Sequence, residues 1–251
     1  MKVSTIMFGL LAACQILPAT AQTGAMPRGD VSDVTRANLA DQYGPEQLRN
    51  AYRFAVTRLK VLADKRLAYT YDFVNDTNLA LAGGNVIKSQ VKTSYAYDDK
   101  GRSRTVSSTA GLERIVIADP TQHAVYLVCP ERKEILRLQG GVLDEPAPVP
   151  EQIPRSSMVD LGEKVFAGVK ASGVRSEKTI PAGAQGNDKP LVHTSETWFS
   201  QELATVVSMR MSMPELGDFY MHVENLKFGD VPASTFALPE GYAIRDIALH
   251  E

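Results

Sequence analysis

The stretch that decides the fold class is LAYTYDF, residues 67–73. Its large apolar side chains occupy every second position, which places them on one side of an extended strand: Leu67, Tyr69, Tyr71 and Phe73. After Arg66 the same period of two continues through most of the chain, with turn-forming residues between the alternating stretches. The sequence therefore predicts a mainly β protein.

Further strands are predicted from the same alternation, most of them separated by turn sequences such as Asp98-Asp99-Lys100-Gly101 and Asp119-Pro120. Their approximate ranges are 85–98, 102–109, 112–118, 123–129, 133–138, 159–169, 172–180, 191–199, 203–213 and 218–227. Gly83-Gly84 is predicted to turn the chain after the first strand. Because the connections are short, consecutive strands are expected to be antiparallel neighbours.

One helix is predicted before the strands, from Pro45 to about Lys65, because apolar residues recur there at spacings of three and four. Residues 22–44 are polar and weakly patterned, which predicts a flexible N-terminal arm. Prolines at four positions in residues 139–157 exclude a central strand and favour an extended crossing or a mobile flap. Residues 45–251 are predicted to form one β-rich domain.

Residues 1–21 have the pattern of a signal peptide: Lys2 precedes an uncharged apolar stretch, which ends at the small-residue cleavage site Ala19-Thr20-Ala21. A competing signal is Leu11-Ala12-Ala13-Cys14, which resembles the lipobox of bacterial lipoproteins, whose cysteine carries lipid. We favour cleavage after Ala21, because the apolar run continues past Cys14. Both interpretations predict export to the periplasm or cell envelope. No later apolar run reaches ~18 residues, so no transmembrane segment is predicted in the mature chain.

Composition excludes some classes of partner. The chain has 251 residues, of which 44% are hydrophobic, and this suffices for a sizeable core. Its 27 Lys and Arg nearly balance 29 Asp and Glu, so no strong field would attract nucleic acid, and no nucleic-acid partner is predicted. After removal of the leader Cys129 would be the only cysteine. The apolar run AVYLVC around it favours a buried, inert thiol over a reactive thiol or an intermolecular bridge.

Residues that could carry chemistry form no known catalytic pattern. No G-x-S-x-G sequence occurs. The four histidines are scattered without HxH or HExxH spacing: His123, His193, His222 and His250. No enzyme activity, metal site or cofactor is therefore predicted. The most unusual local pattern is Met209, Met211 and Met213 on one side of a strand, with Met221 on the next strand. Thioethers could bind copper(I), but the same spacing makes an apolar face that packs adaptably, and packing is the favoured interpretation.

Several stretches resemble a family of secreted bacterial proteins with no assigned activity, which belongs with the LolA-like envelope proteins. They are Asp119-Pro120 followed by AVYLV, LGEKVFAGVKASGVRSEKTIPAG at 161–183, Gly186-Asn187 with Pro190, SETWFSQEL at 195–203 and FALPEGY at 236–242. The resemblance implies a strongly curved antiparallel sheet, an open half-barrel, wrapped around a helix and presenting an apolar concave face. Carriers of that fold hold acyl chains on this face.

The same motifs have structural explanations. Gly162, Gly168 and Gly173 suit strand ends or bulges, the sequence PAGAQGNDKP at 181–190 suits a hairpin loop, and Trp198 suits a core anchor. Because the family has no assigned catalytic residues, no site residue is carried over from it.

The favoured functional hypothesis is a non-catalytic exported protein that binds an apolar small molecule, a lipid chain or a lipidated partner on a concave sheet face. Alternation alone selects the candidate binding residues: Leu67, Tyr69, Tyr71, Phe73, Val207, Met209 and Met211. One alternative is an enzyme whose site is assembled only by the fold, and another is a structural or sensory module that binds an envelope protein. Converging histidines and carboxylates would favour the first alternative, and an extended edge strand or a flat exposed patch the second.

The overlapping leader signals generate a prediction about processing. We expect the mature chain to begin at Gln22, cyclised or not, because the apolar run of the leader ends next to a small-residue cleavage site. Intact-mass spectrometry of protein purified from its own envelope measures this directly. A diacylated or triacylated Cys14 at the N-terminus would instead identify a lipoprotein.

Overall fold

The computed structural model describes residues 67–81, 84–109, 112–139 and 158–248. The first six strands in this part are β1 (Tyr69–Ala80), β2 (Val86–Tyr97), β3 (Ser103–Thr109), β4 (Leu112–Asp119), β5 (Ala124–Cys129) and β6 (Glu134–Gln139). They are followed by β7 (Met158–Phe166), β8 (Val169–Ile180), β9 (Leu191–Ser200), β10 (Thr205–Met213), β11 (Gly217–Phe228) and β12 (Ala243–Ala248). Two short 3-10 helices are also present, η2 (Pro130–Arg132) and η4 (Ala233–Phe236).

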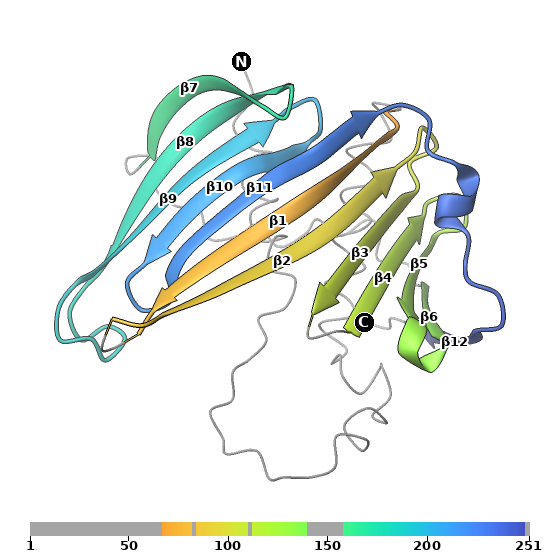
Figure 1. Cartoon of the computed structure of the whole chain (residues 1–251), viewed down its shortest axis with the longest axis horizontal. Coiled ribbons are helices and arrows are strands. Elements are labelled where there is room, and N and C mark those ends of the chain that lie inside the picture. The colour runs from red at the N-terminus through yellow and green to blue at the C-terminus, as the bar shows by residue number, and fades with distance from the viewer. Residues whose placement is uncertain (1–66, 82–83, 110–111, 140–157, 249–251) are drawn as a thin grey trace, which may run out of the picture.

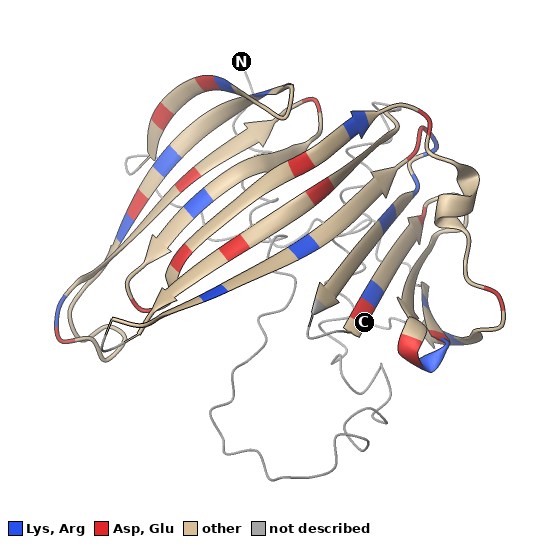
Figure 2. Ribbon diagram, viewed as in Figure 1, with Lys and Arg blue, Asp and Glu red and all other residues tan. Residues whose placement is uncertain are grey.

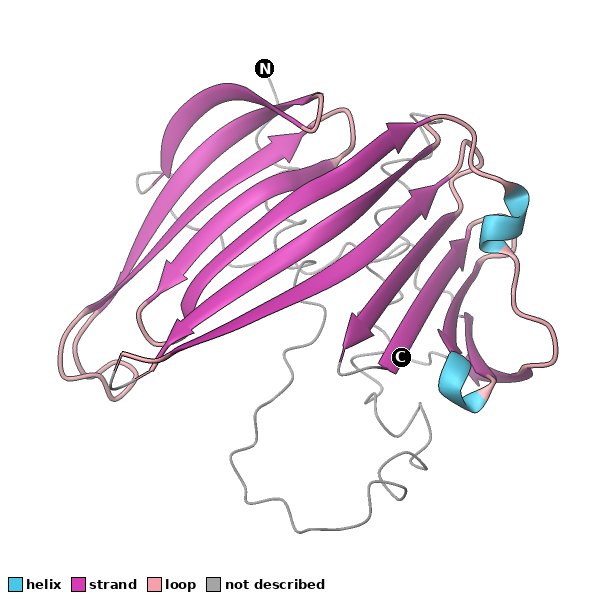
Figure 3. Ribbon diagram, in the orientation of Figure 1, coloured by secondary structure: helices cyan, strands magenta, loops and turns pink. Residues whose placement is uncertain are grey.

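The strands form a single open sheet in the order β12-β6-β5-β4-β3-β2-β1-β11-β10-β9-β8-β7, and the sheet is visibly curved (Figure 1). Figure 3 shows strands throughout the described residues, with helical turns only at η2 and η4. Neighbouring strands are antiparallel except for β12 and β6. The predicted fold class, a mainly β chain folded as a curved, largely antiparallel open half-barrel, is therefore confirmed. No helix in the described ranges is both long and apolar enough to span a membrane.

The strands predicted from alternation correspond to β1 through β11, with boundaries that differ by a few residues. Their turns also form as expected. Asp98 accepts hydrogen bonds from the backbone N–H groups of Lys100 and Arg102, and residues 181–190 connect β8 to β9 as a hairpin loop. The predicted helix at 45–65, the arm at 22–44 and nearly all of the proline-rich segment at 139–157 lie outside the described residues.

One strand, β12, was not predicted, and the expectation of antiparallel neighbours is wrong where it pairs with β6. The two strands run parallel, from Ala243 opposite Glu134 to Ala248 opposite Gln139. The Arg137 guanidinium on β6 donates to the Asp246 carboxylate on β12, although the two residues are 109 positions apart. A pairing over that distance leaves no local signal in the sequence.

The two faces of the sheet differ in character. Register sets Tyr69 opposite Tyr97 and Tyr71 opposite Tyr95, so the odd-numbered residues of β1 and β2 share one face, which we call the apolar face. The opposite face, called the polar face here, carries the even-numbered residues of these two strands. The chain after β11 covers the β2–β6 part of the polar face. Phe236 of η4 is buried there in a cluster with neighbours from four strands: Ala96, Ile117, Ala124, Tyr126, Val128 and Ile135.

Glycines meet three different requirements around β7 and β8. Gly162 has φ +74° beside a β-bulge in β7, and Gly168 has φ +86° in the turn that follows, so both match the sequence-based explanation. Gly173 lies inside β8, opposite Gly162 at the same bulge, and it has a further reason to be a glycine. A Cβ at Gly173 would lie 2.6 Å from carbons of the Trp198 ring, so the glycine leaves room for the indole. Trp198 is buried, as predicted, and packs against Phe166.

Gly173→Ala should destabilise the fold through this contact. We expect a loss of about 1–3 kcal/mol in the free energy of unfolding, the usual cost of overpacking, because the ring has to move off β8. Urea unfolding of four proteins tests the cause: the parent, Gly173→Ala, Trp198→Leu and the double variant. If the clash is with the indole, the double variant loses clearly less than the sum of the two single losses. Additive losses would contradict this explanation.

Candidate functional site

Four stacked tyrosines form one end of the apolar face. The ring centroids of Tyr69 and Tyr97 are 4.8 Å apart, and those of Tyr71 and Tyr95 are also 4.8 Å apart. The rings meet because the β1–β2 register sets each pair directly opposite, where side chains lie closest. The fully buried Tyr69 donates its hydroxyl hydrogen to the carbonyl of Leu203 at 3.3 Å, which ties β1 to the β9–β10 turn.

Methionine and phenylalanine continue the apolar face on β10 and β11. Met209 lies opposite Met221, and Met211 lies opposite Phe219. Met209 and Met221 are buried in one cluster with Phe199 and Val206. Three half-buried side chains pack against this cluster: Phe73, Met211 and Phe219. These contacts favour packing over copper(I) binding for the methionine stripe.

The structure brings all seven candidate residues together. Five of them belong to or pack against one hydrophobic cluster: Leu67, Tyr69, Tyr71, Phe73 and Val207. Met209 and Met211 belong to the adjoining cluster, and Phe73 packs against both. Val207 lies at the bulge where β10 shifts register against β9. β11 makes this assembly possible, because it pairs with β1 on one side and with β10 on the other.

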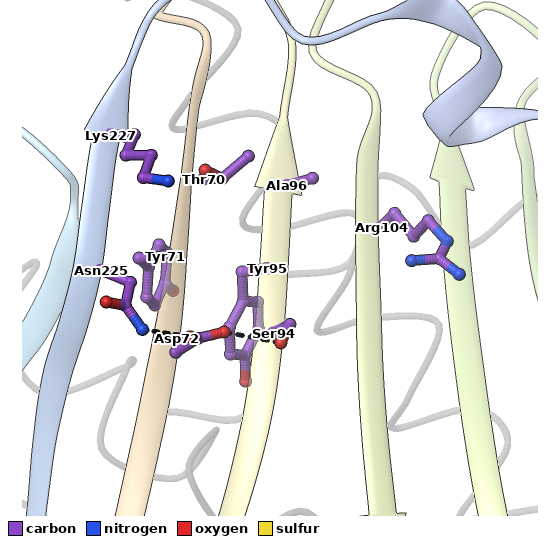
Figure 4. Close-up of a pocket in the computed structure, with 9 residues that line it drawn as sticks. All are labelled: Thr70, Tyr71, Asp72, Ser94, Tyr95, Ala96, Arg104, Asn225 and Lys227. Carbon is purple, nitrogen blue, oxygen red and sulfur yellow. Dashed lines mark hydrogen bonds between the residues drawn. The ribbon is translucent and has the colours of Figure 1, made fainter.

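A pocket of about 500 Å³ lies on the polar face, where sequence reasoning predicted no site (Figure 4). Register aligns one residue from each of four strands across it: Lys227 of β11, Thr70 of β1, Ala96 of β2 and Arg104 of β3. The two small side chains in the middle of this row leave space between the two long cationic ones. Alternation assigns these residues to a polar face, but only the strand register places them in one row.

Asp72 lines this pocket and is held by three donors. Ser94 and Asn225 donate to its carboxylate oxygens at 2.6 and 2.7 Å, and the Lys92 ammonium lies 2.6 Å from Oδ2. Asn225 comes from a bulged part of β11, where its φ is +52°. Burial raises the pKa of Asp72, but the hydrogen bonds and the Lys92 charge together outweigh burial and hold this pKa below its ordinary value. The carboxylate of Asp72 on β1 therefore links this strand to β2 and β11.

Two of the histidines lie beside carboxylates. His193 lies 2.6 Å from Glu215, and His222 lies 2.9 Å from Glu224. Within the described ranges no group of three or more His, Cys, Asp or Glu is placed to hold a metal ion. Burial raises the pKa of the Cys129 thiol, and so do the hydrogen bond that the thiol donates to the Glu131 carboxylate and the charge of that carboxylate, so the thiol is poorly ionised. His123 occupies the turn before β5, and His250 lies outside the described residues.

No protein-family model matches the sequence, and no curated protein matches it. Solved structures resemble the fold. An uncharacterized conserved protein from Thermus thermophilus has a TM-score of 0.43 at 8% identity, over 78% of this chain and 99% of that one. MucB, solved in complex with MucA(peri), has a TM-score of 0.39 at 15% identity, over 77% of this chain and 61% of that one. A LolA superfamily protein from Nitrosomonas europaea has a TM-score of 0.33 at 7% identity, over 73% of this chain and 97% of that one. Likenesses at these TM-scores identify no ligand or partner.

Asp72 should make stability depend on pH. Its pKa in the folded protein is below the ordinary value of 3.8, so the ionised group stabilises the fold above that pH, and the contribution is lost as pH falls through the folded pKa. We expect Asp72→Asn to lower the free energy of unfolding by about 1–3 kcal/mol at pH 7, the usual range for hydrogen bonds to a charged group. Near pH 2 the difference from the parent should shrink.

Urea unfolding of parent and variant at both pH values measures the effect. Asp218→Asn is the control, because Asp218 is an exposed aspartate on the neighbouring strand. The control should leave the pH dependence of the parent unchanged. A loss for Asp72→Asn that is equal at pH 7 and near pH 2 would contradict the assignment.

Proposed function

We propose that this protein is a non-catalytic, exported envelope protein that binds an apolar ligand, a lipid chain or a lipidated partner on its apolar face. The observation that supports this most directly is the meeting of the seven candidate residues in two adjoining clusters across β1, β11 and β10. None of these seven side chains carries a charge, and all of them are aromatic, aliphatic or thioether groups.

The apolar face has fully buried side chains and others that are partly exposed to solvent. Tyr69, Tyr71 and Met209 are at most 3% exposed and act as packed core. Phe73 and Met211 are only half-buried, and both pack against the cluster of Phe199, Val206, Met209 and Met221. A ligand would therefore contact the half-buried residues first and use the buried ones as a rigid floor.

The energetics favour a chain-like ligand. Removing a methylene group from water contributes ~0.8 kcal/mol, so about ten methylenes can outweigh the cost of ordering the ligand and give micromolar affinity or better. Methionine suits such a surface, because its unbranched, polarisable side chain adapts to apolar groups of different shape. The ligand class best matched to these residues is a saturated or unsaturated acyl chain, free or attached to a partner.

Titration with a fluorescent fatty acid tests the proposal. We expect saturable binding by the parent and at least a tenfold weaker affinity in Met211→Asp, because the substitution places a carboxylate on the accessible part of the apolar face. Met211→Leu keeps the volume and apolar character of the side chain and should bind like the parent. Ser212→Lys adds a charge one position along β10, on the polar face, and should also bind like the parent.

Circular dichroism establishes that each variant is folded before the titration is interpreted. Absence of binding by a well-folded parent would mean that the apolar face is only core, and the proposal would then be wrong.

A further inference from the structure

A second hollow, of about 440 Å³, lies on the polar face where the chain after β11 passes over β4 and β5. The strands give it an apolar base, made of Ile115 and Ile117 from β4 and Val128 from β5. The chain after β11 contributes further apolar groups, among them Pro239 and Tyr242. We call this space the β4 hollow.

Strand register explains why an apolar hollow adjoins the polar pocket. The row of residues that crosses the polar pocket ends with Arg104 of β3, and the next strand sets Ile117 opposite it. On β4, Ile115 lies two residues before Ile117 and so on the same side, and Val128 lies opposite Ile115. Arg104 lines both spaces and therefore marks the boundary between them.

Arg104 is a half-buried cation without an ionic partner. It is the only charged residue of β3, which therefore carries one blue band in Figure 2. It makes no hydrogen bond or ion pair in the part of the chain that the structure describes, whereas Arg102 nearby is paired with Asp98 at 2.7 Å. Figure 4 shows its side chain turned away from Lys227, toward β4. Such a guanidinium suits a carboxylate, because it can donate two parallel hydrogen bonds to the two oxygens.

The opposite end of the β4 hollow is acidic. Glu113 lines it, four positions before Ile117 on the same side of β4 and thus ~14 Å away along the strand. The backbone N–H of Glu113 donates to the Glu131 carboxylate at 2.6 Å, so a second negative charge lies beside this end. These unlike ends favour one orientation of an anionic ligand, with its charge at Arg104 and its apolar part over Ile115.

The size and charge of the β4 hollow restrict the class of ligand. A volume of about 440 Å³ is in the lower part of the range for small-molecule sites, ~300–1,000 Å³, and such sites combine an apolar lining with a few polar groups. A compact molecule fits this space better than a protein segment does. One negative charge suffices for Arg104, and further charges would approach Glu113 and Glu131.

We propose that the β4 hollow binds a small organic acid that joins one carboxylate to an apolar body, with the carboxylate on the Arg104 guanidinium and the body over Ile115, Ile117 and Val128. This site lies on the polar face, whereas the proposed function uses the apolar face. Each can therefore be tested without the other.

Isothermal titration calorimetry with phenylbutyrate tests the site, and phenylbutanol is the neutral probe of matched shape. We expect the parent to bind phenylbutyrate saturably and roughly tenfold or more tightly than phenylbutanol, because only the carboxylate can form charge-assisted hydrogen bonds with Arg104. Arg104→Met keeps an unbranched apolar stem but removes the guanidinium. The variant should lose roughly tenfold or more in affinity for phenylbutyrate and stay within about threefold of the parent for phenylbutanol.

Two further variants locate the site. Arg210→Met is the matched control, because it removes an exposed guanidinium from the polar face on β10, four strands away from β3. The control should bind phenylbutyrate like the parent. Ile115→Thr keeps a β-branched side chain in the base of the hollow but introduces a hydroxyl, and it should weaken the binding of both probes by about threefold or more. Circular dichroism and urea unfolding establish that each variant is folded.

Four outcomes would overturn the proposal. The folded parent could fail to bind phenylbutyrate saturably, it could bind phenylbutanol as tightly, or Arg210→Met could lose as much affinity as Arg104→Met. Binding that persists in Arg104→Met but disappears in Met211→Asp would place the probe on the apolar face instead. If the parent binds phenylbutyrate through Arg104 but binds no fluorescent fatty acid, the proposed function fails and the site in the β4 hollow stands.

Discussion

The register of β1 against its two neighbours is the constraint on which the rest of this structure depends. β1 lies between β2 and β11, and the pairs Tyr69 with Tyr97 and Phe73 with Val223 decide which side chains meet on the apolar face. Because side chains alternate with a period of two, a slip of one residue would move the tyrosines to the polar face and Asp72 to the apolar one. The hydrogen-bonded Asp72 carboxylate, which joins β1 to β2 and β11, holds this register from the polar side.

Register shifts explain how such a large sheet can curve. They occur between β1 and β11, between β9 and β10 and between β7 and β8. Each shift adds twist and bends a strand, which a flat ladder of hydrogen bonds would resist. The same irregularities place individual residues: Asn225 reaches Asp72 from one bulge, and Val207 joins the apolar cluster at another. Curvature and site geometry therefore have a common origin in a few positions where the pairing is irregular.

The two faces of the sheet differ in what packs against them. The apolar face is fully packed at the stacked tyrosines and only half-buried at Phe73 and Met211. On the polar face the chain after β11 covers the sheet with Phe236, whose ring also lies 4.8 Å from the Arg102 guanidinium. The chain after β11 therefore adds to the core over the β2–β6 part of the sheet.

The sequence by itself determined the strands β1 to β11, most of their turns, the burial of Cys129 and Trp198, and which residues of β1 and β10 share a side of their strand. These are local properties, because alternation and turn chemistry act over a few residues. Only the tertiary structure decided that β11 joins β1 to β10, that β12 pairs in parallel with β6, and that Lys227, Thr70, Ala96 and Arg104 line up across a pocket. Gly173 shows the difference in a single residue: its place opposite the β7 bulge fits the sequence-based expectation, but only the pairing of β8 with β9 brings the Trp198 ring against it. Pairing between distant strands depends on the summed burial of whole faces, which no short stretch of sequence records.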